Sequence, residues 1–170
     1  MKISLIGYMG SGKSTIGPEL AVLSGLDYYD LDAEIEKHTG YTITETIFNK
    51  GELYFRKLER EKLHEILAKD NFVLSTGGGT PCYYDNIDVI NKNSLSVYLQ
   101  YNVKELFERL KGNTAERPLI AHLEGEPLQE YIGKHLFERS TYYDKATVVI
   151  KAGKLNKLEI LKEIKNYTHE

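Results

Sequence analysis

The chain has 170 residues, of which 41% are hydrophobic and 28% are charged, and its formal net charge is −3 at pH 7. These values exclude an intrinsically disordered chain and a broad electrostatic attraction to nucleic acid, so an anionic ligand would have to meet a local cluster of cations. One cysteine excludes an internal disulfide framework, and no apolar run reaches the roughly 18 residues that span a membrane. We expect a single domain over residues 1–170, in the cytoplasm, with no nucleic-acid or membrane partner.

Strands and helices alternate along the chain. The predicted order is a strand at 3–6, a helix at 14–24, a strand at 28–31, helices at 33–39, 42–49 and 52–69, a strand at 72–75, a helix at 84–91, a strand at 94–99, a helix at 103–111, a helix at 127–143, a strand at 146–150 and a helix at 157–167. Residues 112–125 are polar and bounded by glycine, which predicts a mobile loop. This alternation predicts an α/β fold, in which helices cover both faces of a five-stranded parallel sheet and ligands bind beyond the carboxyl ends of the strands.

The segment from Gly7 to Ser14 matches the phosphate-binding pattern G-x-x-x-x-G-K-[ST], with a predicted strand before it and a predicted helix after it. Glycines let the backbone N–H groups turn toward a phosphate, and the following helix adds the positive end of its dipole. Lys13 would then reach the β- and γ-phosphates of ATP, while the Ser14 hydroxyl would hold Mg²⁺. The alternative is a glycine-rich turn that carries Lys-Ser by chance, and the flanking strand and helix disfavour it.

The phosphate loop alone does not identify a kinase. A GTPase needs a guanine-reading N-K-x-D sequence after a strand, whereas the stretch 91–94 lacks the aspartate and precedes a predicted strand. The large ATPase classes need a longer chain. The small kinases remain, in which a second site for an acceptor faces the γ-phosphate.

Two carboxylates, Asp30 and Asp32, stand at the end of the second predicted strand. Residues two apart on an extended segment point to the same side, so both would face the space opposite the phosphate loop. One can hold Mg²⁺ through water, while the other orients an attacking hydroxyl and takes its proton. The alternative is that Asp32, which directly precedes a predicted helix, serves as its N-cap.

Arginine is scarce in this lysine-rich chain. Only five of the 22 basic residues are arginines, at positions 56, 60, 109, 117 and 139. Arginine is preferred where a planar fork must grip a carboxylate or a phosphate, although each one taken singly is more often a solvated charge, and we interpret Arg60 in that way. The run Gly77-Gly78-Gly79 after the third strand permits close approach of backbone to a ligand, and a flexible turn near Pro81 is the alternative.

Taken in order, these motifs resemble the shikimate kinase family, whose members phosphorylate the 3-hydroxyl of shikimate in aromatic amino-acid synthesis. The resemblance extends from residue 2 to about residue 150. It rests on residues 10–15, Asp30-x-Asp32, Phe55-Arg56 with Glu59, Gly77-Gly78-Gly79, Asn113-Thr114 with Arg117-Pro118-Leu119, and Arg139.

The resemblance implies a three-layer P-loop kinase fold that works as a monomer on ATP, Mg²⁺ and shikimate. It places an acceptor-binding segment at about 32–60 and a mobile lid at about 112–125. Asp32 would bind the acceptor hydroxyl and serve as the catalytic base. Lys13 and Arg117 would complete the catalytic set, with Arg117 reaching the transferred phosphate from the lid.

The remaining implied contacts fall into three groups. ATP would contact Gly10, Ser11, Gly12, Lys13, Ser14, Thr15, Arg109 and Arg117, with Arg109 stacked on adenine. Mg²⁺ would be held by Ser14 and, through water, by Asp30. Shikimate would contact Asp32, Arg56, Gly77, Gly78, Gly79 and Arg139, with Glu59 orienting Arg56 and with Phe48 and Phe55 forming the pocket wall.

Two other functions are compatible with a phosphate loop. A kinase of gluconate or of nucleoside monophosphates would share the nucleotide site, but a monophosphate acceptor calls for a different arginine layout and a longer acceptor-binding segment. A binding protein that had lost catalysis would be expected to lack Asp32, Arg56 or Arg139, and the chain has all three.

Overall fold

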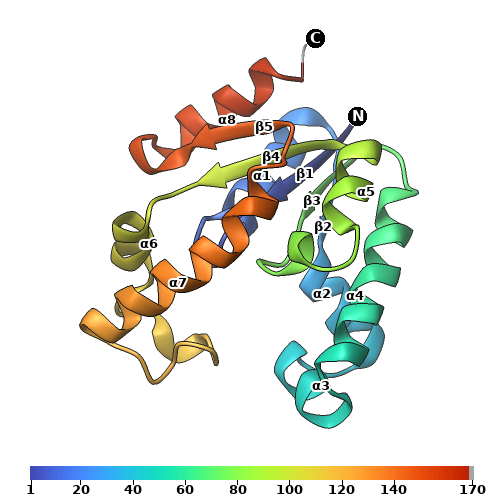
Figure 1. Cartoon of the computed structure of the whole chain (residues 1–170). Helices are drawn as coiled ribbons and strands as arrows, with labels where there is room; N and C mark the ends of the chain where they lie inside the picture. Colours follow the sequence, from blue (N-terminus) through green and yellow to red (C-terminus); the bar gives the residue numbers. More distant parts are fainter. Residues whose placement is uncertain (169–170) are drawn as a thin grey trace.

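A computed structural model describes residues 1–168 and contains a five-stranded parallel sheet with helices on both faces (Figure 1). The strands are β1 (Lys2–Ile6), β2 (Asp27–Asp30), β3 (Phe72–Ser75), β4 (Leu95–Gln100) and β5 (Val148–Lys151), in the spatial order β2-β3-β1-β4-β5. In the central register, Ile3 of β1 lies opposite Val73 of β3 and Leu95 of β4. The predicted α/β fold with a parallel sheet is therefore confirmed.

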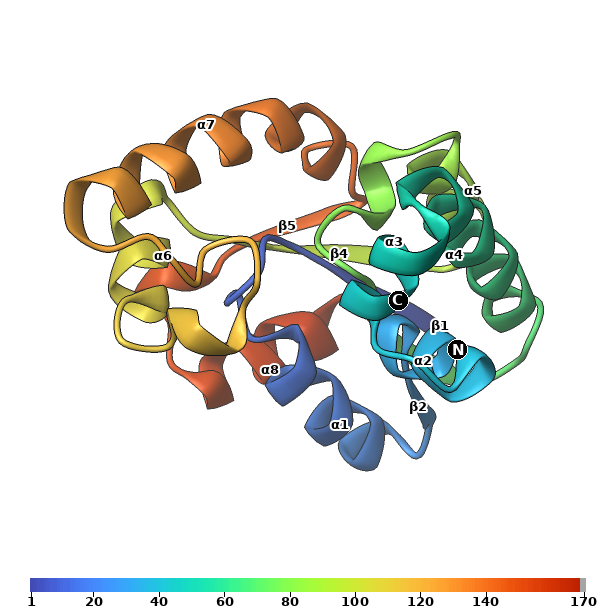
Figure 2. The ribbon, with the colours of Figure 1, turned by 90° about the horizontal axis from the view of Figure 1, so that it is seen from below.

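Eight α-helices within residues 1–168 connect and cover the strands. They are α1 (Lys13–Ser24), α2 (Leu31–Thr39), α3 (Ile43–Lys50), α4 (Glu52–Leu67), α5 (Asn86–Asn93), α6 (Val103–Leu110), α7 (Gly125–Tyr143) and α8 (Lys157–Asn166). Helices α1 and α8 pack on one face of the sheet, and α4, α5 and α7 lie on the other (Figures 1 and 2). Among these residues, no helix combines the length and the apolar character needed to span a membrane.

The burial of the strands follows their position in the sheet. All four residues of β3 are buried, because β3 has a strand on each side and helices on both faces. Strand β5 lies at the edge, and its residues alternate between buried and exposed. The continuous apolar runs therefore identify central strands, whose carboxyl ends meet at one edge of the sheet.

The start of α2 differs from the sequence prediction. Strand β2 ends at Asp30, whose carboxylate accepts a hydrogen bond from the backbone N–H of Ala33 at 3.0 Å. Asp30 is therefore the N-cap, and Asp32 lies in the first turn of the helix. Both alternatives given for Asp32, a place on an extended strand and a role as N-cap, are wrong, because Asp30 is in position to satisfy the first free N–H groups of the helix.

Residues 112–125 contain more order than a bare loop. A 3₁₀ turn spans Thr114–Glu116, and the side chain of Ile120 is fully buried. The segment is thus anchored to the protein by an apolar side chain, and its mobility stays a prediction. Residues 169 and 170 of the predicted domain lie outside the described residues.

Gly17 determines how closely α1 approaches the sheet, and its replacement by alanine should weaken the fold. A Cβ at this position would overlap the ring of Tyr28 and lie 2.8 Å from Ser75 Oγ. We expect Gly17→Ala to lower the free energy of unfolding by about 1–3 kcal/mol in urea denaturation, despite the better helix propensity of alanine. Gly133→Ala in α7 is the control, because its Cβ would meet Val103 at an ordinary 3.8 Å. Equal or greater stability of Gly17→Ala would contradict this packing argument.

Candidate active site

The loop between β1 and α1 holds its lysine against the backbone. Gly12 precedes α1 with a φ of 89°, in the left-handed region that glycine adopts without strain. The ammonium of Lys13 donates hydrogen bonds to the carbonyl oxygens of Gly7 (2.6 Å) and Tyr8 (3.1 Å). Burial lowers the pKa of Lys13 to about 8, although the Asp32 carboxylate opposes that shift. A largely desolvated cation therefore lies within the curve of the loop.

Two recesses meet beyond the carboxyl ends of the strands. The first, which we call the phosphate-loop recess, has a volume of about 510 Å³ and is lined by Met9, Gly10, Gly12, Lys13, Ser14, Thr15, Asp30, Asp32, Thr76, Gly77, Gly78, Arg109 and Arg117. The second, the arginine recess, has a volume of about 300 Å³, and its lining includes Ile43, Ile47, Phe55, Arg56, Glu59, Gly79 and Arg139. The two recesses share Met9, Asp32, Gly77, Gly78 and Arg117.

Almost all of the predicted site residues line one of these recesses. Ser11 and Phe48 are the exceptions; Ser11 is 1% exposed, and its hydroxyl lies 3.3 Å from the Lys13 ammonium. The structure therefore brings the predicted nucleotide side and the predicted acceptor side together at one junction.

Ser14 and Asp30 provide oxygen atoms at the edge of the phosphate-loop recess. The Ser14 hydroxyl donates a hydrogen bond to Asp30 Oδ2 at 3.2 Å. Among residues 1–168 there is no cluster of three histidine, cysteine, aspartate or glutamate side chains that could enclose a metal ion. Mg²⁺ commonly takes one or two protein oxygens and completes its shell with water and phosphate, so this pair fits Mg²⁺ bound together with a nucleotide.

Asp32 lies at the junction of the two recesses. Burial raises the pKa of its carboxyl group to about 6, and the nearby carboxylates of Asp30 and Glu59 add to this shift, while Lys13 opposes it. Asp32 is thus mostly ionised at neutral pH, but it accepts a proton more readily than an exposed aspartate does. Such a group can act as a general base toward a hydroxyl placed at the junction.

The three consecutive glycines each make room for a different functional side chain. A Cβ on Gly77 would lie 3.1 Å from Asp32 Oδ1, and a Cβ on Gly78 would lie 3.1 Å from Arg139 Nη1. On Gly79 it would lie 2.8 Å from Nη2 and 2.9 Å from Nη1 of Arg56, between the two ends of the guanidinium fork. The missing side chain at Gly79 leaves open the space in which a carboxylate would meet this fork.

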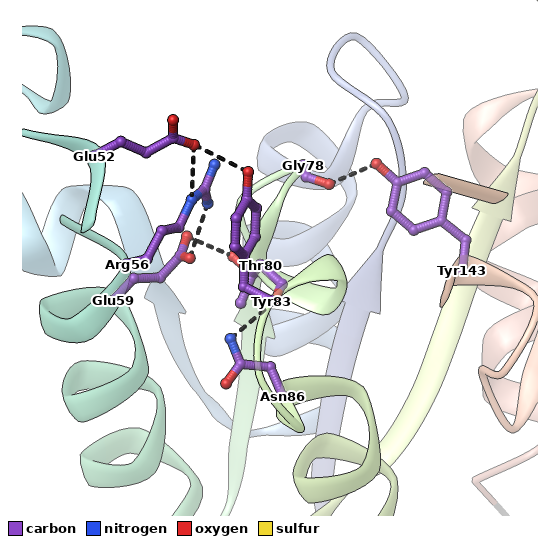
Figure 3. Close-up of polar contacts among 8 residues, drawn as sticks. All are labelled: Glu52, Arg56, Glu59, Gly78, Thr80, Tyr83, Asn86 and Tyr143. Carbon is purple, nitrogen blue, oxygen red and sulfur yellow. Dashed lines mark hydrogen bonds and ion pairs between the residues drawn. The ribbon is translucent and has the colours of Figure 1, made fainter. Parts of the chain in front are cut away.

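A buried hydrogen-bond network through Glu59 holds the Arg56 guanidinium in place (Figure 3). Arg56 Nη1 donates to Glu59 Oε1 at 2.9 Å, and Glu59 is 1% exposed. The second carboxylate oxygen of Glu59 accepts a hydrogen bond from Thr80 Oγ1 at 2.9 Å, and the Thr80 carbonyl accepts one from the Asn86 amide. Glu59 therefore has a partner on each oxygen, and the expected orientation of Arg56 by Glu59 agrees with this geometry.

The other four arginines have distinct surroundings. Arg117 lines both recesses, and Arg139 lies beside Gly78 in the arginine recess. Arg109 donates from Nε to the Gly10 carbonyl at 2.6 Å, which ties α6 to the phosphate loop. Arg60 pairs with Asp85 at 2.9 Å on the surface, in agreement with its interpretation as a solvated charge.

Two features of the site differ from, or were absent in, the sequence prediction. Phe48 is 88% exposed and lies outside the lining of the arginine recess, whereas Ile47, one position earlier on α3, lines it. Neighbouring residues on a helix point about 100° apart, so the prediction chose the wrong apolar side chain. Sequence reasoning also missed Tyr143, a fully buried residue whose hydroxyl donates to the Gly78 carbonyl at 2.5 Å. Its position one turn after Arg139 was the available signal.

The family model and the curated relatives identify the same family. The model of the shikimate kinase family matches residues 9–168. The shikimate kinase of Flavobacterium johnsoniae is 45% identical over 147 residues, which cover 85% of this chain and 86% of that protein. The crystal structure of shikimate kinase from Bacteroides thetaiotaomicron has a TM-score of 0.94 at 33% identity and covers 100% of this chain and 99% of its own. Shikimate kinase from Acinetobacter baumannii in complex with shikimate has a TM-score of 0.87 at 31% identity, covering 98% and 92%.

The raised pKa of Asp32 has a consequence for stability. Its folded-state pKa of about 6 exceeds the ordinary value of 3.8, so ionised Asp32 destabilises the folded protein above pH 6, and the penalty disappears as the pH falls below about 4. We expect Asp32→Asn to raise the free energy of unfolding by about 1–3 kcal/mol at pH 8, with the gain shrinking toward pH 4. Urea denaturation across this range measures the gain, with the exposed Asp70→Asn as the control. A less stable Asp32→Asn protein at pH 8 would show that the site stabilises this carboxylate.

Proposed function

The chain belongs to the shikimate kinase family and is an ATP-dependent kinase, and we propose that it transfers the γ-phosphate of ATP to the 3-hydroxyl of shikimate, giving shikimate 3-phosphate and ADP. One observation carries this proposal: the two recesses meet at Asp32, and the recess on the far side from the phosphate loop contains both Arg56 and Arg139. Shikimate has a carboxylate for the arginines and hydroxyl groups for the aspartate. The carboxylate of shikimate therefore matches the arginine end of the recess, and its hydroxyl groups match the Asp32 end.

The arginines would grip the carboxylate of shikimate. Arg56 offers the open end of its fork beside Gly79, and Arg139 lies next to Gly78. A carboxylate held by two guanidinium groups has few orientations, because each fork prefers a planar approach. This arrangement would direct the hydroxyl groups of the ring toward Asp32.

Asp32 would act as the general base. As the acceptor oxygen forms its bond to the γ-phosphorus, the bond from phosphorus to the bridging oxygen of the β-phosphate breaks, ADP leaves, and the hydroxyl proton passes to Asp32. Lys13 and Arg117 would offset the negative charge on the transferred group. Phosphoryl transfer depends mainly on such positioning and charge neutralisation, which are what these side chains can supply.

Nucleotide binding would use the residues that surround the phosphate-loop recess. The loop from Gly10 to Thr15 would cradle the phosphates, and Arg109 would contact adenine. Ser14 and, through water, Asp30 would hold Mg²⁺, which supplies positive charge to the phosphate oxygens. The 3.2 Å contact between these two side chains supports a shared metal site.

We further propose that residues 112–125 form a lid and residues 32–60 an acceptor-binding segment, within a single cytoplasmic domain that works as a monomer. The presence of Arg117 in the lining of both recesses supports the lid, because closure of this segment would bring a cation to the transferred phosphate and exclude water.

Coupled measurement of ADP release tests the reaction directly. The protein with MgATP is given shikimate, gluconate, AMP or no acceptor in parallel, and we expect turnover with shikimate alone. Turnover with gluconate or AMP would keep the phosphate-transfer site but reject the acceptor assignment. Clear ATP binding without any turnover would instead indicate a binding protein.

The role of Asp32 predicts a selective loss in its amide variant. We expect Asp32→Asn to lower kcat by at least about 100-fold, because the base is lost, while ATP affinity stays within about threefold of the wild type. Lys13→Ala is the contrast, since it removes a phosphate contact and should weaken ATP binding strongly. Nucleotide titration by calorimetry and the coupled assay give the two quantities. A loss of ATP affinity in Asp32→Asn as large as that in Lys13→Ala would assign Asp32 to the nucleotide instead.

A further inference from the structure

The Arg56 guanidinium separates two recesses. On one side is the arginine recess, and on the other is an outer recess of about 330 Å³, lined by Glu52, Leu53, Arg56, Tyr83 and Tyr84. An arginine side chain has several rotatable bonds, so a guanidinium in this position could turn toward either space. Glu52, exposed at the rim of the outer recess, would attract it outward. Some feature must therefore keep Arg56 directed at the arginine recess.

Tyr83 closes the outer side of Arg56 (Figure 3). The centre of the Tyr83 ring lies 3.9 Å from Cζ of Arg56, which is a close stacking contact between the ring and the cation. The Tyr83 hydroxyl donates a hydrogen bond to Glu52 Oε1 at 2.9 Å. The tyrosine thus covers the guanidinium and hydrogen-bonds the same Glu52 oxygen that pairs with Arg56 Nε, which weakens the outward pull of this carboxylate.

The contacts of the Arg56 nitrogen atoms are consistent with a guanidinium directed at the arginine recess. Nη1 is bound to Glu59, and Nε is buried, without a hydrogen-bond partner within residues 1–168. The Glu52 oxygen lies 3.6 Å from Nε, too far for a hydrogen bond. Tyr83 takes the hydrogen bond to this oxygen, so Glu52 keeps only a long ion pair with Arg56. The end of the fork remains open toward the space beside Gly79.

We propose that Tyr83, held by Glu52, is a positioning residue that keeps Arg56 directed at the arginine recess for the carboxylate of the acceptor. This inference rests on the proposed function for the identity of the acceptor. A guanidinium fixed before binding loses less freedom when the carboxylate arrives. The pair of Tyr83 and Glu52, which we call the clamp, therefore favours acceptor binding. It makes no contact with the phosphate loop, and its loss should leave the nucleotide side unchanged.

Three variants test the clamp by steady-state kinetics. We expect Tyr83→Leu to raise the KM for shikimate by about 3- to 30-fold, with the KM for ATP and kcat each within about twofold of the wild type. Tyr83→Phe keeps the ring but loses the hydrogen bond to Glu52, so it should raise the KM for shikimate by less than Tyr83→Leu does. Tyr84→Asn is the matched control: Tyr84 stacks in the same way on Arg60, at 4.9 Å, and asparagine tolerates its φ of 49°. We expect this control to match the wild type.

A second measurement needs no substrate. Side-chain NMR of the arginines in the ligand-free protein reports how freely each guanidinium rotates, and Arg56→Lys identifies the Arg56 signal. We expect restricted rotation of Arg56 in the wild type and free rotation in Tyr83→Leu. Glu52→Ala, an exposed change that removes the partner of the Tyr83 hydroxyl, should give intermediate rotation of Arg56. This variant replaces Tyr83→Leu in the test if Tyr83→Leu does not fold.

The two measurements separate the possible failures. An Arg56 signal that is unchanged in Tyr83→Leu and in Glu52→Ala overturns the clamp, and so does an unchanged KM for shikimate in Tyr83→Leu. A parallel rise in the KM for ATP also overturns it, because a general structural defect would explain both. If the wild type does not use shikimate but Tyr83→Leu frees the Arg56 guanidinium, the proposed acceptor is wrong and the clamp stands.

Discussion

The candidate active site depends on a stretch of backbone without side chains, at Gly77, Gly78 and Gly79. Asp32 from α2, Arg139 from α7 and Arg56 from α4 approach these glycines in turn, to within 2.8–3.1 Å of where a Cβ would stand. Side chains at these positions would displace the carboxylate and the two guanidinium groups. The bare backbone therefore lets three helices present their charges around one small space.

The glycine run is itself fixed by the sheet and by α7. Thr76, just before it, donates from its hydroxyl to the Leu5 carbonyl at 2.9 Å, which ties the end of β3 to β1 and so to the phosphate loop. The Gly78 carbonyl accepts the hydrogen bond from Tyr143, and Thr80, just after the run, binds Glu59. Glycine would otherwise make this segment flexible. These side-chain contacts supply the rigidity that the glycines lack. They also fix the position of the phosphate loop relative to the arginine recess.

Sequence reasoning succeeded where the signal was local. The phosphate loop, the glycine run and the scarce arginines are recognisable from short stretches, and the structure places them around the two recesses. The prediction put Asp30 and Asp32 opposite the phosphate loop, and both line the phosphate-loop recess. It was wrong about the local structure of Asp32, because it overlooked that Asp30 could cap the helix. Phe48 was wrong because eight residues of helix, with two adjacent apolar side chains, do not define which one faces inward. Tyr83 was missed because its partner lies 31 residues away, and such a contact leaves no local pattern. The partner of Tyr143 lies 65 residues away, and the only local signal for Tyr143 was its place one turn after Arg139.

The most direct test of this account is a crystal structure of the protein with MgADP and shikimate. We predict that the carboxylate of shikimate lies between Arg56 and Arg139, against the backbone of Gly78 and Gly79. The 3-hydroxyl should then lie within hydrogen-bond distance of Asp32, on the side of the phosphate loop. A reversed ligand, with its carboxylate toward Lys13 and its hydroxyl groups toward the arginines, would contradict the central claim that the bare backbone arranges these charges for one orientation of the acceptor.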